Sequence, residues 1–376
     1  MKALNGLRVI DLSNLLAAPQ VSALLGDFGA DVLKLEPPGG DPLQGLGVSR
    51  GGQSVPYSLA NRGKRVAEVD LETQDGREAV AGLIEAADVV VVNQPRSLLE
   101  RWELTYEQVS VRNPRLVYVW VTCYGADGPY ADLPGNGSLA EAFAGLTHLT
   151  GASDGPPVLP SSALGDPLVA VSGLIGTLLA CYARDVGGAS GQLVDVSMFE
   201  PVLGLLGLTV AAWDGRSEPP MRTGSRVHGG VPRNVYATSD GRWVVLSGTT
   251  DAQVRRVLQV IGAQAAQERY ATSAARLAVA DELDALVADW IRERPRAEVV
   301  AAFREARVPV SPVNDLADLA ADPQVLARES LVRLADDVLA AAPFPRLSAT
   351  PGAIEQLGPR ERVTAATVLR DWQADR

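Results

Sequence analysis

The sequence predicts an α/β fold in which a large domain with a mainly parallel, Rossmann-like sheet is joined to a smaller α+β domain. Over residues 8–121, short β runs alternate with amphipathic helical segments, which is the pattern of βαβ units. The run Val89-Val90-Val91-Val92 is apolar on both faces, as expected for a central strand of a parallel sheet. Beyond residue 232, a hairpin followed by amphipathic helices indicates a second unit.

The first βαβ unit is expected to contain a strand over residues 8–12, a helix over 20–28 and a strand over 31–35. Pro19 suits the first helical position because its missing N–H would be unpaired there, and Gly29 suits the helix end. The alternation continues through a strand over 65–71, a helix over 76–87, a strand over 88–93, a short helix over 106–111 and a strand over 116–121.

A long apolar helix is expected from Pro167 to about Ala183, after a helical segment over 138–149 and a Gly- and Pro-rich loop over 151–160. One face of this helix carries only small residues, namely Ser172, Gly173, Gly176 and Thr177. Such a face lets another backbone approach closely. It fits packing within one core and packing against a second subunit equally well.

A linker is expected over 211–232, where the stretch from Gly224 to Gly230 fits a plain linker or a mobile lid. The unit that follows begins with a hairpin over 234–247, turning at Asp240-Gly241. Its helices are expected near 252–261, 279–291 and 296–306, and a final helix near 362–372. These elements give a large domain over 1–210, completed by about 335–376, and a small domain over 233–320.

Composition and charge argue against nucleic-acid binding, membrane association and disulfide bonds. The 376-residue chain has a net charge of −11 and no block of Lys and Arg, so we expect no nucleic-acid partner. No uninterrupted apolar run reaches membrane-spanning length, and the amino terminus leads into a strand, so we expect a cytoplasmic protein without a membrane partner. Cys123 and Cys181 lie in apolar segments and are expected to be buried, reduced thiols.

Three common catalytic patterns are missing or out of context. With only His148, His228 and two cysteines, the chain cannot build the usual His or Cys metal sites, although a carboxylate-bound Mg²⁺ stays open. The segment Gly47-Val48-Ser49-Arg50-Gly51 matches a hydrolase nucleophile elbow, but a Gly- and Pro-rich loop precedes it instead of a strand. Residues 13–19 lack the glycines of a dinucleotide-binding turn, so Glu36 is interpreted as a solvated strand end.

Asp166 is the candidate for covalent chemistry. Because Asp166 and Pro167 open the long apolar helix, the carboxylate is expected to cap the free N–H groups of the first turn. A helix N-terminus also favours the ionised carboxylate, which suits a nucleophile that accepts an acyl group. The same residue can do both, so the two interpretations stay open.

Several short segments follow one another in a characteristic order: Leu7 to Leu12, Gly29 to Asp41, Asn61-Arg62-Gly63-Lys64-Arg65, Tyr124 to Tyr130, Thr150-Gly151 with Asp154-Gly155-Pro156-Pro157, and Gly165-Asp166 with Gly191-Gln192. On these segments the chain resembles the family III CoA-transferases, the group that contains formyl-CoA and carnitine CoA-transferases. The resemblance extends from about Leu4 to the carboxyl end, and the hairpin over 236–246 resembles the start of the family's small domain.

The resemblance implies a ping-pong transfer of CoA from an acyl-CoA donor to a carboxylic acid acceptor. Asp166 would attack the thioester to form a mixed anhydride, and the released CoA thiolate would convert this to an aspartyl-CoA thioester. CoA is then a co-substrate, with no tightly bound cofactor. The family also implies a large domain built from both ends of the chain and a homodimer of interlocked subunits.

Carried over residue by residue, the family's CoA contacts fall on Leu16, Ala17, Leu71 within the stretch 69–72, Asn93, Gln94, Arg101 and Asn136. Arg101 is the best match, since a guanidinium suits a nucleotide phosphate. The chain departs from formyl-CoA transferase at four positions: Leu16 replaces an amide, Pro37 and Glu72 replace basic residues, and Gln94 replaces an aromatic residue.

Two alternatives remain open beside the transferase. An α-methylacyl-CoA racemase would need a His base, but Asn136 and approximately Thr250 stand at the matching positions, and an amide cannot act as a general base. A non-catalytic family member acting as a partner subunit is the other. The identities of donor and acceptor are not predicted.

Overall fold

The computed structural model describes residues 1–227 and 229–374, which fall into two compact units. The first unit comprises Met1–Thr147, Leu159–Glu218 and Ala327–Arg376, and the second comprises His148–Val158 and Pro219–Leu326. The predicted α/β class is confirmed. The domain boundaries drawn from the sequence stay a prediction, and His228 lies outside the described residues.

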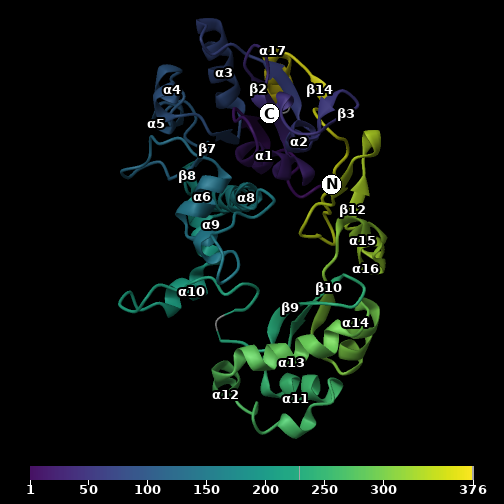
Figure 1. The fold of residues 1–376 in the computed structure, drawn as a ribbon. Coiled ribbons are helices and arrows are strands. Elements are labelled where there is room, and N and C mark those ends of the chain that lie inside the picture. Colours follow the sequence, from purple (N-terminus) through teal and green to yellow (C-terminus); the bar gives the residue numbers. More distant parts are fainter. Residues whose placement is uncertain (228, 375–376) are drawn as a thin grey trace. The chain divides into compact units, whose positions relative to one another are not determined.

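A seven-stranded sheet forms the centre of the first unit (Figure 1). Its strand order is β14-β5-β2-β1-β6-β7-β8, and every neighbouring pair is parallel. Strands β2 and β5 follow one another on one side of β1, and β6, β7 and β8 follow one another on its other side. The direction in which successive strands are added therefore reverses between β1 and β6. The strands are β1 (Arg8–Asp11), β2 (Asp31–Glu36), β5 (Arg65–Glu68), β6 (Val89–Val92), β7 (Val117–Thr122), β8 (Leu193–Ser197) and β14 (Glu361–Arg362).

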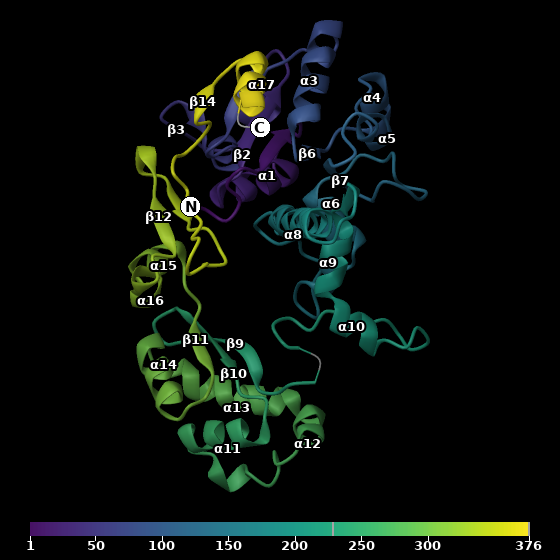
Figure 2. The ribbon, with the colours of Figure 1, turned by 180° about the vertical axis from the view of Figure 1, so that it is seen from behind.

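Helices cover both faces of this sheet (Figure 2). On one face, α3 (Gln74–Ala86) and α17 (Ala365–Ala374) pack in a core that contains Ile10, Leu83 and Trp372. On the other face, α1 (Ala17–Asp27) and α8 (Gly165–Asp185) pack against Val9 and Val91. Alternate residues of β1 and β6 therefore enter different cores, which explains why β6 is apolar throughout and why Val9 and Ile10 of β1 are both buried.

The predicted strands and helices of this unit are present with small shifts at their ends. The first helix begins at Ala17, so Pro19 occupies its third position instead of the first. The predicted segment over 138–149 is two short helices, α6 (Gly137–Phe143) and α7 (Leu146–Leu149). The other helices of the first unit are α2 (Val55–Ala60), α4 (Arg96–Arg101), α5 (Tyr106–Ser110), α9 (Phe199–Leu205) and α10 (Gly207–Ala212). Helix α15 (Leu316–Ala321) falls in the second unit, and α16 (Pro323–Ala327) lies at the boundary between the two units in the sequence.

Helix α8 uses its small residues inside the unit. A Cβ atom added at Gly173 would lie 2.7 Å from Val21 of α1, and one added at Gly176 would lie 2.6 Å from Val194 of β8. Of the two interpretations of the small-residue face, packing within one core therefore holds for these glycines. By length and composition α8 could also cross a membrane, but a core helix of a soluble protein passes the same test.

A buried network of charges holds the segment after β1. The Lys64 ammonium lies 2.7 Å from the Asp11 carboxylate, and both side chains are fully buried. Lys34 pairs in the same way with Asp41 at 2.9 Å and donates to the Ser13 carbonyl. Burial acts against ionisation of Asp11, but the charges of Lys64 and Lys34 outweigh it and hold its pKa well below 3.8.

The second unit is α+β, as predicted. Its antiparallel sheet has the order β11-β10-β9, and the predicted hairpin is confirmed as β9 (Arg233–Ala237) and β10 (Trp243–Ser247), with β11 (Val310–Pro312) alongside. Its helices include α11 (Asp251–Val260), α12 (Ser273–Ala278), α13 (Ala280–Arg292) and α14 (Arg296–Glu305). Two-residue or three-residue strands β3 (Ser49–Arg50), β4 (Gln53–Ser54), β12 (Leu331–Arg333) and β13 (Leu339–Ala341) complete the chain, together with 3₁₀ turns over 42–45, 264–266 and 335–337.

Both cysteines are free and buried, as the sequence predicted. Burial raises the pKa of the Cys181 thiol to about 11. Burial likewise raises the pKa of Cys123. Neither thiol is therefore activated as a thiolate near neutral pH.

Candidate active site

Asp166 lies at the edge of the sheet where the strands end. Helix α8 connects β7 to the parallel strand β8, so it runs back against the strand direction and its first turn lies at their carboxyl ends. The start of α6 is anchored at the same edge, because a Cβ atom at Gly135 would lie 2.1 Å from the sulfur of Cys123, which directly follows β7. Ligands of open α/β sheets bind at this edge.

Two glycines bring the first turns of α6 and α8 together. A Cβ atom at Gly165 would lie 2.9 Å from the carbonyl oxygen of Gly137, and one at Gly137 would lie 3.0 Å from Cγ and Oδ2 of Asp166. The Asp166 carboxyl group therefore lies directly over the bare Cα of Gly137. A larger residue at position 137 would displace the Asp166 carboxyl group directly, and one at position 165 would displace it by pushing against the backbone of Gly137.

Asp166 does not cap its helix, so the capping interpretation is wrong. The N-cap position is Leu164, which has no side-chain cap, and Asp166 is already the second residue of α8. The Gly165 N–H donates instead to Oε1 of Glu141 at 2.7 Å. Within residues 1–227 and 229–374, no hydrogen bond reaches the Asp166 carboxylate.

The protonation of Asp166 also differs from the expectation. Burial, and then the negative charge of Glu141, raise the pKa of Asp166 above its ordinary value of 3.8. The helix N-terminus was expected to favour the ionised form, whereas burial and Glu141 both favour the neutral form. A carboxylate with a raised pKa is more basic, and so a stronger nucleophile once ionised.

A cavity of about 280 Å³ lies at the carboxyl ends of β5, β2, β1 and β6, beside the reversal of strand order. One wall is the loop after β1 and another is the loop after β5. Of the predicted CoA contacts, Leu71 and Gln94 line it. The other lining residues include Asn14, Pro37, Val69, Asp70, Glu72, Leu98 and Trp102.

Two residues predicted to contact CoA, Asn93 and Gln94, directly follow β6 and hold the loop after β1 in place. Asn93 accepts a hydrogen bond from the Asn14 N–H at 3.0 Å and donates to the Asn14 carbonyl at 3.0 Å. Gln94 donates to the Leu12 carbonyl at 3.0 Å. These amides therefore shape one wall of the cavity, and their contact with CoA stays a prediction.

Arg101 is tied to an acidic partner at the cavity. Its guanidinium pairs with Glu72, whose carboxylate also accepts from the Trp102 indole N–H at 3.2 Å. The Arg101 and Glu72 side chains are well exposed. The basic residue that the family resemblance placed on a phosphate is thus partly neutralised by the acid that departs from the family pattern.

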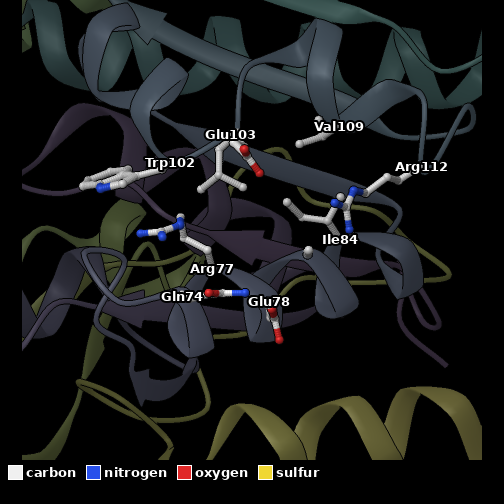
Figure 3. Close-up of a pocket in the computed structure, with 10 residues that line it drawn as sticks. Gln74, Arg77, Glu78, Ile84, Trp102, Glu103, Val109 and Arg112 are labelled. Atoms are coloured by element: carbon white, nitrogen blue, oxygen red, sulfur yellow. Dashed lines mark hydrogen bonds between the residues drawn. The ribbon is translucent and has the colours of Figure 1, made fainter.

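Trp102 also borders a second hollow, of about 270 Å³, between α3 and the α4–α5 segment (Figure 3). Arg77 and Arg112 lie on opposite sides of this hollow, with Glu78 and Glu103 also on its lining. Because its two guanidinium groups are balanced by two carboxylates, the hollow offers no net charge to an anion. We assign it no role in the site.

The three remaining predicted contacts lie outside the lining of the cavity. Leu16 and Ala17 form the start of α1, with Ala17 buried. Asn136 caps α6, accepting from the Leu139 N–H at 3.2 Å. Thr250, the second position considered for a racemase, caps α11 in the second unit.

Sequence reasoning missed Glu141, Gly137 and Trp102. The segment Asn136-Gly137 carries a recognisable signal, since Asn followed by Gly before an apolar helical run predicts a cap and a close approach. Glu141 carries a weaker one: an acid on the apolar side of a short helix needs a buried partner. That partner, Gly165, is not adjacent in the sequence.

Comparisons of the sequence and of the structure with known proteins agree with one another. The sequence profile of CoA-transferase family III matches residues 4–361. The succinyl-CoA–D-citramalate CoA-transferase of Chloroflexus aurantiacus is 34% identical over 366 residues, covering 95% of this chain and 91% of the relative. The succinyl-CoA–L-malate CoA-transferase beta subunit of the same organism is 36% identical over 98% of this chain and 93% of its own length. A solved CAIB/BAIF family protein from Brucella suis has a TM-score of 0.86 and 30% identity, with 99% of both chains covered.

Proposed function

The chain belongs to CoA-transferase family III, and we propose that Asp166 is the nucleophile through which it moves CoA from an acyl-CoA donor to a carboxylic acid acceptor. The CoA-transferase activity follows from the family and from full-length relatives of that activity. The identity of the nucleophile rests on the arrangement around Asp166. The observation that supports it best is the state of the Asp166 carboxylate. It is half-buried at the ligand-binding edge of the sheet, and no described residue forms a hydrogen bond to it.

The proposed transfer uses four displacements. A carboxylate oxygen of Asp166 attacks the acyl carbonyl of the donor, the C–S bond breaks, and the CoA thiolate leaves a mixed anhydride behind. The thiolate then attacks the aspartyl carbonyl and releases the donor acid as a carboxylate, which leaves an aspartyl-CoA thioester. The acceptor carboxylate attacks this thioester and frees the thiolate again. Attack of the thiolate on the acceptor carbonyl forms the new acyl-CoA and restores ionised Asp166.

The cavity at β5, β2, β1 and β6 is proposed to bind the nucleotide end of CoA. It lies at the same edge of the sheet as the first turn of α8, so one extended molecule can reach from the cavity toward Asp166. Leu71 and Gln94 would contact CoA directly, and Asn93, also a proposed contact, would hold the wall formed by the loop after β1. Leu16, Ala17, Arg101 and Asn136 remain proposed contacts from the family resemblance.

Succinyl-CoA is the proposed donor, and a small dicarboxylic acid is the proposed acceptor. The relatives named above use succinyl-CoA with citramalate or malate, and a further relative from Agrobacterium fabrum, 32% identical over 98% of this chain, is a succinate–glutarate CoA-transferase. These acids share two carboxylates on a short chain. The pairing of donor and acceptor in this chain is to be settled with a substrate panel.

A homodimer is also proposed. The outer face of α8 exposes Leu179 and Tyr182 by 65% and 66%, and Leu208 of α10 is 90% exposed. Large apolar side chains as exposed as these are typical of surfaces that another chain covers. Light scattering should give twice the mass of one chain for the native protein and a smaller mass for Leu179→Glu.

Intact-mass spectrometry tests the nucleophile. We expect succinyl-CoA to add a CoA group that hydroxylamine removes, and we expect Asp166→Asn to form no adduct while keeping the native unfolding temperature. Exchange of deuterium at the α-carbon without an adduct would favour the racemase alternative. A folded protein that forms no adduct with any donor would support the non-catalytic alternative.

A further inference from the structure

A second carboxylate, which the transfer steps above do not use, lies beside Asp166. Glu141 belongs to α6, and its residue is only 1% exposed. Its Oε1 accepts the Gly165 N–H at 2.7 Å, at the residue immediately before Asp166. The N-terminus of the long helix α8 favours an ionised group at this place, and a hydrogen bond from an N–H to a carboxylate is strengthened by the charge.

The surroundings hold Glu141 in place. Phe143 of the same helix packs edge to face against Tyr124 and Phe199, with ring centroids 5.1 Å apart in both pairs. Asn136 caps the other end of α6. With α6 fixed at both ends and Gly137 in contact with Gly165, Glu141 keeps its position at the start of α8.

Among the described residues, Glu141 is the one charged group that acts on Asp166. The other ionisable side chains of the elements packed against α8 have partners of their own. Asp27 of α1 binds Arg62, and Asp195 of β8 accepts from the Ala126 N–H. Glu200 of α9 accepts from Ser197, and Tyr118 of β7 donates to the Leu104 carbonyl.

We propose that Glu141 is a positioning residue of the transfer reaction, which fixes the first turn of α8 and sets a second negative charge against Asp166. This inference rests on Asp166 being the nucleophile. Acylation turns the ionised Asp166 into a neutral anhydride or thioester and so removes the repulsion between the two carboxylates. Glu141 therefore favours the acylated states of the enzyme over the free carboxylate.

The protonation of Asp166 agrees with this role. After burial, Glu141 is the second cause that raises the pKa of Asp166. Acylation and protonation both cancel the charge of Asp166, so a neighbour that raises its pKa also favours its acylation. The acid limb of the pH–rate profile for acylation reports this pKa, because the protonated acid is not a nucleophile.

Two substitutions separate the charge of Glu141 from its hydrogen bond. Glu141→Gln keeps an oxygen that accepts from Gly165 but removes the charge, whereas Glu141→Ala removes both. In single-turnover acylation by succinyl-CoA, we expect Glu141→Gln to move the acid limb to lower pH and to reduce the adduct present at neutral pH. Glu141→Ala should also slow acylation by about tenfold or more, because the nucleophile loses its alignment. An acid limb that does not move in Glu141→Gln would overturn the inference.

Glu200→Gln is the matched control, since it removes a carboxylate from a neighbouring helix that does not act on Asp166. Carbon-13 NMR of protein labelled at aspartate Cγ gives a readout that does not depend on turnover, with the Asp166 signal identified from Asp166→Asn. We expect its titration midpoint to fall in Glu141→Gln and to stay unchanged in Glu200→Gln. An unchanged midpoint in Glu141→Gln overturns the inference even if adducts form. Absence of an adduct in the native enzyme instead contradicts the proposed nucleophile.

Discussion

Gly137→Ala should impair acylation of Asp166 without unfolding the protein. The added Cβ would lie 3.0 Å from both Cγ and Oδ2 of Asp166, whereas unstrained contacts between such atoms are about 3.5 to 4.0 Å. The carboxyl group must therefore move by roughly 0.5 to 1 Å. A displacement of this size at a reacting atom costs about 10- to 100-fold in rate. Gly137 is helical and its φ is not positive, so Ala fits the backbone itself.

The assay is rapid-quench mass spectrometry of single-turnover acylation by succinyl-CoA, together with thermal unfolding of the same samples. Gly82→Ala is the control, because Gly82 lies inside α3 and its new Cβ would make an ordinary contact at 3.4 Å with Leu369 of α17. We expect the control to acylate at the native rate and the free energy of unfolding of Gly137→Ala to stay within about 1 kcal/mol of native. A folded Gly137→Ala that acylates at the native rate would refute the placement of Asp166 over this glycine.

Two further predictions concern the sheet edge. Lys64→Met leaves the buried Asp11 without its partner at 2.7 Å, so urea unfolding should show a loss of about 3 to 5 kcal/mol. Lys2→Met, which breaks the exposed pair with Glu355, should cost at most about 1 kcal/mol, and equal losses in both variants would contradict this reasoning. Glu72→Gln frees Arg101, so steady-state kinetics at low salt should show KM for succinyl-CoA lowered by about two- to fivefold. Glu100→Gln, which removes one of the two carboxylates paired with Arg96 on the same helix, should leave KM unchanged. A KM that rises in Glu72→Gln would place Arg101 outside the CoA site.

Local patterns were sufficient to predict five strands of the central sheet, but not β8 or β14. The strands β6 and β7 are short runs of mainly apolar residues buried on both faces, and the pairs Val9-Ile10 and Val32-Leu33 mark β1 and β2. The hairpin of the second unit was equally clear from Asp240-Gly241, because this turn needs a residue with positive φ, which Gly241 supplies at 71°. Helices α9 and α10 were not predicted. Their apolar residues, among them Leu203, Leu205 and Leu208, are exposed in a single chain and do not follow one buried face.

The site was predicted less completely because its contacts join distant segments. Asp166 was found from its motif, but the expected cap assumed that the nearest carboxylate serves the helix N-terminus. The structure satisfies that N-terminus from α6 instead, and although Asn136-Gly137 indicates a close approach there, no local pattern identifies Gly165 as the partner. Trp102 was missed for a related reason, since an aromatic residue after a short helix shows no sequence signal for the cavity that it borders.

The division of roles between Glu141 and Asp166 follows from competition for one set of donors. A carboxylate that caps a helix accepts hydrogen bonds from N–H groups. These bonds stabilise its ionised form and lower its tendency to attack a carbonyl. In this chain Glu141 accepts the hydrogen bond from the Gly165 N–H. Asp166 therefore lies at the start of the helix without a hydrogen bond that would weaken it as a nucleophile. The same Glu141 charge opposes the free Asp166 anion. The double variant Glu141→Asp with Asp166→Glu should therefore show no CoA adduct by intact-mass spectrometry, because the shorter side chain at position 141 cannot reach Gly165 and the longer one at position 166 can turn back to cap it.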